Sequence, residues 1–447
     1  MKLAQALGLR PGETVAFTGA GGKTGAMFGL ARELGGTIIL TTTTHLGAWQ
    51  AGLADQHIIV NGIEDIPPIE SDQPQILLFT GPVNAENRLT PLPEDVLTEV
   101  HSRCTKIGIH FLIEADGARK RPLKAPAPYE PVVPDWVDLV VVVAGLSGVG
   151  KPLTEEWVHR PALFSGLTGL ALGERISCQN LVDLLSSEAG GLQGIPAGAR
   201  RVCFLNQADH ALTQAMAQRM ARQLSGIYER VLIGSLEKPA EDEPVFAVHS
   251  QIAGVILAAG GSERLGVPKQ LLDWGGSPFI TQIIKNALES RLMPLIVVTG
   301  AGHAEIEKAC RDFPVRIVHN ERWAEGQATS MQLGLAALPE DCQGVVFLLS
   351  DQPQVSPLLI RGLIERFSAH RNPITAPQIA GRRGNPVLFA RETFDALRSV
   401  TGDRGGRAVM QQFKVDWLPW VDDRALLDVD QEGDLARLRS AYEVPRG

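Results

Sequence analysis

The sequence lacks three features that would point to common classes of protein. No Cys-x-x-Cys pair occurs among its five cysteines, which argues against a disulfide framework and a zinc knuckle and favours a reducing compartment. Positive charge is not in excess, because 42 Lys and Arg face 50 Asp and Glu, and a formal net charge of -8 argues against a nucleic-acid partner. No apolar run approaches the roughly 20 residues that span a bilayer, and the first residues lack the apolar core of a signal peptide. We therefore expect a cytoplasmic protein with no membrane partner.

The length of 447 residues suits two large domains or three ordinary ones. Short β-branched runs alternate with amphipathic stretches throughout, which is typical of α/β domains with parallel sheets and crossover helices. An acidic, Pro-rich stretch at residues 234–250 predicts a linker or a last irregular edge strand. We expect two α/β domains, at residues 1–245 and 250–447.

In the first domain the pattern predicts strands at residues 14–18, 37–41, 76–79, 108–113, 139–143, 202–205 and 231–233, and helices at 23–34, 96–106 and 212–224. In the second domain it predicts strands at residues 254–257, 295–299, 315–318, 345–349, 374–376 and 387–389.

A glycine-rich turn separates the first expected strand from the first expected helix. Such a turn aims free N–H groups at phosphate oxygens, a following lysine reaches the terminal phosphates, and a threonine hydroxyl can bind Mg²⁺. The strict G-x-x-x-x-G-K-T pattern fails because Phe17 stands at its first glycine, and the shorter G-x-x-G-K-T form resembles the loop of Mur-ligase-type ATP-binding domains. The alternative is an ordinary strand-to-helix turn. The candidate phosphate-binding residues of this P-loop-like domain are Gly19, Gly21, Gly22, Lys23 and Thr24.

Polar residues also follow two other expected strands of this domain. Glu114 and Asp116 stand where a Walker-B carboxylate would bind metal or orient water. Asn206 and Asp209 resemble the base-reading N-K-x-D motif of GTPases, with Gln207 in place of its lysine. Asn and Asp are also common strand-exit and helix-cap residues, so ATP and GTP both stay open.

A basic cluster lies just beyond these carboxylates, at Arg119, Lys120, Arg121 and Lys124. It could bind an anionic ligand such as a phosphate or a molybdopterin, or it could be a solvated basic loop.

The motifs GAGGKT, TTTTH, EADGARKRPLKAP and the strand leading to NQAD together resemble the YqeC family over roughly residues 1–240. The resemblance implies an accessory factor for selenium-dependent molybdenum hydroxylases. It makes an apo molybdenum hydroxylase the candidate protein partner, whereas nothing in the residues indicates selenium itself.

The second domain opens with the pattern L-A-A-G-x-S-x-R-x-G-x-x-K, which follows a predicted strand directly. Its small residues allow the backbone to approach a triphosphate, and Arg264 and Lys269 place two cations where charge builds up on leaving pyrophosphate. The reaction also needs Mg²⁺, for which Asp351, after the strand at 345–349, and Asp430 are the candidate ligands. The candidate nucleotide-binding residues of this opening motif are Leu257, Ala258, Ala259, Gly260, Gly261 and Ser262.

With GRRGNPV, TGDRGGR and DVDQEGDL, these motifs resemble molybdenum cofactor cytidylyltransferase over about residues 252–440. The resemblance implies a Rossmann-like, GT-A-like nucleotidyltransferase that transfers CMP from CTP to the terminal phosphate of molybdopterin. It implies that Ala259 favours cytosine and that Asn320 and Ser330 line the nucleotide site. It places Gly384, Asn385 and Pro386 on the pterin side.

The leading hypothesis is a fused enzyme, with a Mg²⁺-dependent cytidylyltransferase at the C-terminus and a nucleotide-binding accessory domain at the N-terminus. Two alternatives stay open. One is a sugar-phosphate nucleotidyltransferase, because that superfamily shares the opening motif. The other is a GTP-controlled chaperone that delivers a cofactor and uses the second site only for binding.

Overall fold

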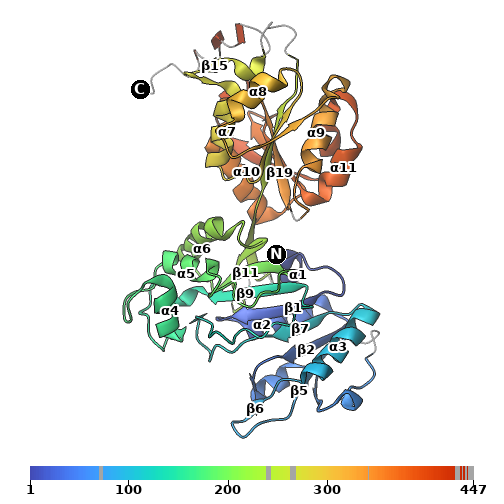
Figure 1. Ribbon diagram of the computed structural model, residues 1–447, viewed down its shortest axis with the longest axis vertical. Coiled ribbons are helices and arrows are strands. Elements are labelled where there is room, and N and C mark those ends of the chain that lie inside the picture. Colours follow the sequence, from blue (N-terminus) through green and yellow to red (C-terminus); the bar gives the residue numbers. More distant parts are fainter. Residues whose placement is uncertain are drawn as a thin grey trace. The chain divides into compact units, whose positions relative to one another are not determined.

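The computed structural model of the chain contains two compact units, Met1–Ser250 and Gln251–Gly447 (Figure 1). It describes residues 1–447 except 70–73, 238–242, 262–267, 341, 428–432, 435, 438–439 and 441–447. None of the helices among the described residues combines the length and the apolar character needed to cross a membrane.

The first unit is built on a sheet to which the described residues contribute nine strands. All its neighbours pair in parallel except β12 and β13 at one edge, which are antiparallel. In spatial order the strands are β13 (Val245–Ser250), β12 (Arg230–Gly234), β11 (Arg200–Asn206), β9 (Leu139–Gly145), β1 (Thr14–Gly19), β7 (Phe111–Glu114), β2 (Thr37–Thr42), β5 (Gln75–Thr80) and β4 (Gln56–Ile59).

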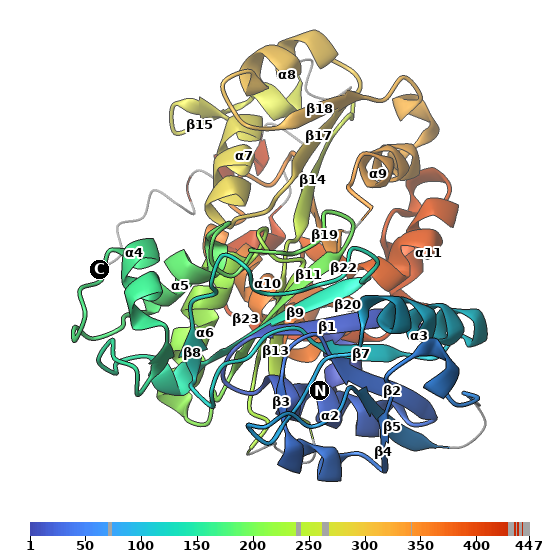
Figure 2. The same cartoon turned by 60° about the horizontal axis from the view of Figure 1, so that its bottom comes forward.

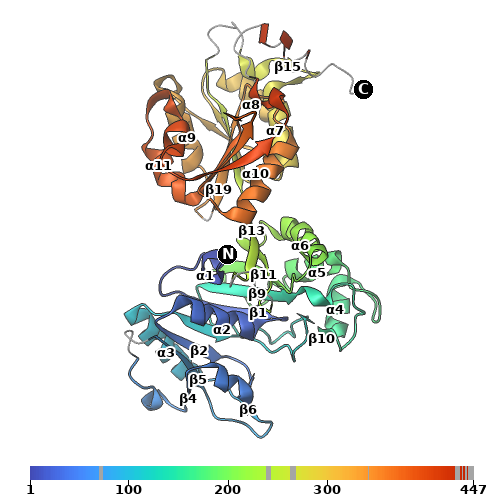
Figure 3. The same ribbon diagram turned by 180° about the vertical axis from the view of Figure 1, so that it is seen from behind.

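Helices cover both faces of this sheet, so its central strands are buried on both sides. This explains why β9 and β2 consist of apolar and Thr residues without alternation. One face carries α1 (Leu3–Leu7) and α2 (Lys23–Leu34), as Figure 3 shows. The other carries α3 (Glu94–Ile107), α4 (Pro161–Thr168), α5 (Cys178–Ser186) and α6 (Ala211–Leu224), as Figure 2 shows.

The register brings the ends of the central strands together at one edge of the sheet. Phe17 of β1 is level with Glu114 of β7, Gly19 of β1 with Val143 of β9, and Asn206 of β11 with Gly145 of β9. The glycine turn, the acidic segment after β7 and the segment after β11 therefore leave the sheet at its carboxyl edge, where open α/β sheets bind ligands. Residues 245–250 form the edge strand β13 and belong to this unit.

The second unit has a mixed sheet, in which four parallel strands continue into antiparallel ones. Its described strands, in order, are β18 (Arg316–His319), β17 (Leu295–Thr299), β14 (Ala253–Ala258), β19 (Gly344–Leu349), β22 (Val387–Ala390), β20 (Ile374–Ile379) and β21 (Arg382–Arg383), and β23 (Val415–Trp420) pairs with β20.

Two apolar cores lie on the two faces of this second sheet. One core includes α9 (Gln327–Ala336), α11 (Phe394–Ser399) and α12 (Arg407–Met410). The other includes α7 (Phe279–Glu289), α8 (His303–Cys310) and α10 (Pro357–His370). In Figure 1, α9 and α11 accordingly lie on one side of β19, and α7 and α10 lie on the other.

Candidate functional site

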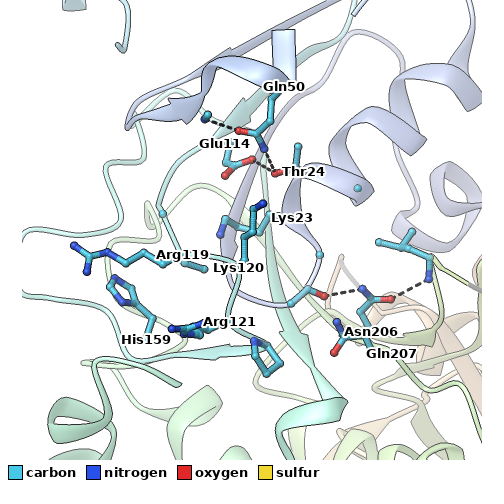
Figure 4. Close-up of a pocket in the computed structure, with 18 of the residues that line it drawn as sticks. Lys23, Thr24, Gln50, Glu114, Arg119, Lys120, Arg121, His159, Asn206 and Gln207 are labelled. Carbon is cyan, nitrogen blue, oxygen red and sulfur yellow. Dashed lines mark hydrogen bonds between the residues drawn. The ribbon is translucent and has the colours of Figure 1, made fainter. Parts of the chain in front are cut away.

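A large cavity of the first unit lies at the carboxyl edge of its sheet and has a volume of about 1730 Å³ (Figure 4). Its walls come from segments that are far apart in the sequence: the start of α2, the residues after β2, β7 and β11, and residues 156–160. Eight lysines and arginines but five glutamates line it, so its wall carries more positive than negative charge. This balance suits an anionic ligand.

The glycine turn at the entry to α2 has a backbone that other residues would not tolerate. Gly19, Gly21 and Gly22 have φ of +87°, +81° and +134°. A Cβ at Gly22 would lie 2.3 Å from Nδ2 of Asn206, and one at Gly21 would lie 2.4 Å from the amide nitrogen of Gly145. The turn is therefore packed closely between β1, β9 and β11, and Gly21 and Gly22 line the cavity.

Lys23 is held in a buried network of charges behind this turn. Its ammonium donates to the carbonyl oxygen of Gly19 at 2.7 Å and lies 3.1 Å from a carboxylate oxygen of Asp116. The other oxygen of Asp116 accepts from the amide of Gly19 at 3.0 Å and lies 2.9 Å from the ammonium of Lys124. Lys124 in turn contacts Glu130 at 2.5 Å. Asp116 therefore neutralises the charge of two buried lysines and holds the turn through its hydrogen bond with the amide of Gly19.

Glu130 joins this network to the opposite wall of the cavity. It accepts two hydrogen bonds from the guanidinium of Arg160, at 2.8 and 3.0 Å. Burial alone would raise the pKa of Glu130, but the hydrogen bonds from Arg160 and Lys124 outweigh it and lower the pKa to about 2. Glu130 is thus ionised in the folded protein.

Thr24 and Glu114 meet on the other side of Lys23. The Thr24 hydroxyl donates to a carboxylate oxygen of Glu114 at 2.7 Å and accepts from the side-chain amide of Gln50 at 3.0 Å. Burial raises the pKa of Glu114, against the opposing effects of Lys23 and Thr24. Carboxyl and hydroxyl oxygens are the ligands that Mg²⁺ prefers in proteins.

Asn206 and Asp209 have different surroundings. Asn206 lines the cavity, donates to the carbonyl oxygen of Gly21 at 2.7 Å and accepts from the amide of Leu236 at 3.1 Å. Asp209 accepts from the Ser235 hydroxyl at 2.5 Å and is not among the cavity-lining residues. Asn206 therefore supports the glycine turn. The Asp209 carboxylate already has a partner, the Ser235 hydroxyl, and does not need a nucleobase to explain its place.

The basic cluster expected from the sequence divides into two parts. Arg119, Lys120 and Arg121 line the cavity, whereas Lys124 is buried between Asp116 and Glu130. No motif predicts the other lining residues, which come from separate segments: Trp49, Gln50, Tyr129, His159 and Arg160.

In the second unit, a cavity of about 510 Å³ opens at the carboxyl ends of β14 and β19. It brings together Lys269 and Asp351, which are 82 positions apart in the sequence. The other expected residues that line it are Leu257, Ala259, Gly260, Gly261 and Ser330. Ala258 is buried in the sheet core, outside the cavity lining.

Gln270 is a further residue of this cavity, and it fixes the opening motif in place. Its buried side-chain amide donates to the carbonyl oxygens of Ala258 and Gly260, both at 3.1 Å. Trp323 packs against the same motif, because a Cβ at Gly261 would lie 3.0 Å from its ring. The contact of Gln270 was not predicted, whereas Trp323 is the tryptophan of an N-x-x-W-x-x-G pattern that begins at Asn320.

Asn320 is buried behind the cavity wall and is not part of its lining. Its side-chain amide donates to the hydroxyls of Thr329 and Ser330, each at 2.9 Å, and its oxygen accepts from the amide of Arg322 at 3.0 Å. Ser330 itself reaches the cavity from α9. Asn320 is thus placed to orient a lining residue.

A second cavity of about 710 Å³ shares part of its wall with the first. The shared residues are Leu257, Gln327, Leu349 and Asp403. Asn385 lines this second cavity, while Gly384 and Pro386 are buried beside it, outside its lining.

Two arginines, Arg383 and Arg407, also line the second cavity. Burial, and then the charge of Arg407, lower the pKa of Arg383. Two guanidiniums facing one cavity favour an anionic group there.

Three expected residues, Ser262, Arg264 and Asp430, lie outside the described residues.

Comparison with known proteins relates each unit to a family. Residues 15–162 match the YqeC protein family, and residues 254–417 match the MobA-like NTP transferase domain. Over 211 residues the chain is 33% identical to the uncharacterized protein YqeC of Escherichia coli (strain K12), which spans 45% of this chain and 79% of that protein.

The second unit has relatives with different names. The chain is 29% identical over 197 residues to nicotine blue oxidoreductase of Paenarthrobacter nicotinovorans, covering 42% of this chain and 96% of the relative. It is 28% identical over 201 residues to molybdenum cofactor cytidylyltransferase of Escherichia coli (strain K12), covering 43% of this chain and 98% of that protein. Both resemblances seen in the sequence are confirmed: the chain belongs to the YqeC family through its first unit, and its second unit is a nucleotidyltransferase domain of the MobA-like family.

Proposed function

We propose that the second unit transfers CMP from CTP to the terminal phosphate of molybdopterin and releases pyrophosphate. The observation that carries this proposal is the pair of cavities with a common wall. One holds Lys269, Asp351 and the glycines of the opening motif, and the other holds Asn385 and two arginines. A nucleotide in the first cavity and a phosphorylated acceptor in the second would meet at that wall.

The reaction forms a bond between an acceptor phosphate oxygen and the α-phosphorus of CTP, and it breaks the bond from that phosphorus to the β-phosphate. Lys269, with Arg264, would neutralise the charge that gathers on the departing pyrophosphate. Arg383 and Arg407 would hold the acceptor phosphate in line for attack. No covalent enzyme intermediate is needed, because positioning and charge neutralisation suffice.

The carboxylates of the cavity that contains Lys269 fit Mg²⁺. Asp351 and Asp403 both line it, and Mg²⁺ prefers oxygen ligands of this kind. Asp351 is the proposed ligand, together with Asp430. Bound Mg²⁺ would supply positive charge to the triphosphate.

The test is pyrophosphate release by the full chain from CTP, Mg²⁺ and molybdopterin. CTP should be used in preference to GTP, and release should need the acceptor. Asp351→Asn should reduce the rate at least about 100-fold, because a metal ligand is lost, whereas the exposed Asp312→Asn should not change it. Efficient turnover with a sugar phosphate in place of molybdopterin would establish the alternative transferase.

We also propose that the first unit binds a nucleoside triphosphate on Gly21, Gly22, Lys23 and Thr24 and assists the maturation of a molybdenum hydroxylase. The glycines with positive φ, the buried lysine and the Thr24–Glu114 pair support this proposal. Asn206 supports the turn, and Asp209 is not part of the cavity lining. The geometry therefore favours neither adenine nor guanine, and binding of ATP and of GTP should be compared.

The chaperone alternative predicts a different result in the same assays. Stable binding of the full chain to an apo molybdenum hydroxylase, with no pyrophosphate release from CTP or GTP under any acceptor, would favour it. Turnover with molybdopterin would exclude a purely binding role for the second unit.

A further inference from the structure

In the cavity of the first unit, one wall carries positive charge that no described residue neutralises. Arg119, Lys120 and Arg121 line it, and their charged groups form no ion pair or hydrogen bond with any residue that the structure describes. The neighbouring cations Lys23 and Arg160, by contrast, are paired with Asp116 and Glu130. Residues 119–121 therefore supply three neighbouring cations to this wall that no described carboxylate balances.

The backbone that carries these cations is held in a fixed shape. Arg119 and Lys120 have φ of +49° and +60°, a left-handed conformation that such residues rarely adopt. The buried ammonium of Lys124 donates to the carbonyl oxygen of Gly117 at 2.8 Å, and the carbonyl oxygen of Pro122 accepts from the amide of Gly145 at 2.9 Å. Residues 119–121 are thus anchored at both ends to the network that supports the glycine turn, and this anchoring maintains the strained conformation.

The surroundings of these cations suit a ring as well as an anion. Trp49 lines the same cavity, 61% of it is exposed, and the ammonium of Lys120 lies 5.2 Å from its ring centroid. Burial and the positive charges of Arg160, Lys124 and Arg119 lower the pKa of His159 to about 4, so its imidazole is neutral at pH 7. An exposed indole beside unpaired cations can stack a planar ring while the cations bind its phosphate.

Arg119 and Arg121 are drawn apart from Lys23 in Figure 4, whereas Lys120 of the same wall is drawn close to it. In Figure 4, Arg119, Arg121 and His159 gather on one side of the view, away from Asn206 and Gln207. The triphosphate end has its own cation, Lys23, and the free N–H groups at the start of α2. Lys23 is already paired with Asp116, so residues 119–121 are cations of this cavity that no described carboxylate balances.

We propose that the first unit binds a second ligand, a phosphate-bearing small molecule with a planar ring, on residues 119–121 and Trp49 while a nucleoside triphosphate occupies the glycine turn. This inference rests on the triphosphate-binding role proposed for the turn. The shared chemistry of the second ligand, a planar heteroaromatic ring with a phosphate, fits a pterin phosphate and a nucleoside monophosphate.

The test uses the full chain saturated with a non-hydrolysable ATP or GTP analogue, and it counts bound probe by equilibrium dialysis. Neopterin monophosphate and AMP serve as the two probes, and neopterin without phosphate tests whether the anion is needed. We expect one probe molecule to bind in addition to the triphosphate. In Arg119→Glu/Arg121→Glu this binding should weaken about tenfold or more, because two charge-assisted contacts become repulsive.

Two further variants sharpen the result. Trp49→Ala should weaken the probe while leaving triphosphate affinity within about twofold, because only the ring platform is lost. Lys106→Glu/Arg219→Glu, which reverses two exposed cations away from the cavity, should leave both affinities as in the wild type. If neopterin monophosphate binds more tightly than AMP, the second ligand is a pterin phosphate, and the reverse order indicates a nucleoside monophosphate.

Three outcomes would overturn the inference: displacement of the probe by the triphosphate, equal loss of both ligands in Arg119→Glu/Arg121→Glu, or probe binding that this variant does not change. The first two would mean that one triphosphate spans the whole cavity, which leaves the role of the glycine turn intact. Probe binding that depends on Arg119 and Arg121, in a chain that binds no triphosphate, would instead reject the nucleotide role and support the second site.

Discussion

Asp116 determines the charge balance of the first cavity, because Lys23 and Lys124 both depend on it. All three side chains are nearly inaccessible to solvent, with at most 4% exposed. A buried ion pair contributes little net stability, but removing one partner leaves an uncompensated charge in a medium of low polarity. The glycine turn also depends on Asp116, which accepts from the amide of Gly19.

We therefore predict that Asp116→Asn lowers the free energy of unfolding of the first unit by about 3 kcal/mol or more. The measurement is chemical denaturation of the full chain at pH 7. The matched control is Asp135→Asn, an exposed aspartate of the same unit, which should change the free energy of unfolding by less than about 0.5 kcal/mol. Equal effects of the two substitutions would show that Asp116 is not an essential counter-charge.

The lowered pKa of Glu130 predicts that the free energy of unfolding depends on pH. Its pKa in the folded protein, about 2, lies below its ordinary value of 4.5, so the unfolded chain takes up the proton first as the pH falls. The stabilisation from Glu130 is therefore complete above about pH 4.5 and is lost as the pH falls toward 2.

In denaturation measurements, the advantage of the wild type over Glu130→Gln should be constant from pH 7 to 5. It should then shrink by about 1 kcal/mol per pH unit below pH 4.5. The exposed Glu155→Gln should show no such narrowing. A difference that stays constant down to pH 3.5 would contradict the assignment of Glu130 to the ion network.

At the scale of elements, the junction between β1 and α2 sets the geometry of the first cavity. Gly22 precedes α2 with a φ of +134°, and a Cβ there would meet Asn206 at 2.3 Å. Gly29 lies within the same helix, where a Cβ would meet nothing within 4 Å. The two glycines differ because Gly22 serves the turn, whereas Gly29 lines the cavity from within the helix, has open space at its Cβ position and lowers the helix propensity.

Gly22→Ala should destabilise the first unit and abolish its stabilisation by a nucleoside triphosphate, since both φ and the space around the Cβ are unsuitable. Gly29→Ala should raise the free energy of unfolding by about 0.5–1 kcal/mol. Both are measured by thermal unfolding with and without ATP or GTP. Retained triphosphate stabilisation in Gly22→Ala would reject the turn as the phosphate site.

The sequence predicts those elements whose signals are local. The helix at residues 23–34 is confirmed as α2, because a glycine turn fixes its start and its apolar spacing is regular. Residues 245–250 carry a weaker signal and form the edge strand β13, whose position depends on β12. The sequence groups Lys124 with the anion-binding or solvated cluster of Arg119, Lys120 and Arg121, but the fold buries it against Asp116, which no local pattern reveals. Trp49 and His159 reach the cavity only through the sheet order, so motif spacing could not place them.

At the scale of the whole molecule, each unit has its own apolar cores. The two large cores of the first unit contain residues up to Val248, and those of the second begin at Ile252. Each unit also has its own candidate site, at the carboxyl edge of its own sheet. Because cooperative unfolding follows shared cores, each unit should unfold as a separate cooperative transition.

Calorimetry of the full chain should therefore show two transitions, and a ligand of one unit should raise only one of them. CTP with Mg²⁺ at about 100 times its dissociation constant contributes about 2.7 kcal/mol, which corresponds to a rise of roughly 5–10 °C for a unit of this size. Asp351→Asn should cancel that rise and leave the other transition unchanged. A single transition that CTP shifts as a whole would contradict independent units. A rise that persists in Asp351→Asn would contradict the placement of the metal–nucleotide complex at Asp351, because the binding free energy of that complex includes the contact between its metal and this carboxylate.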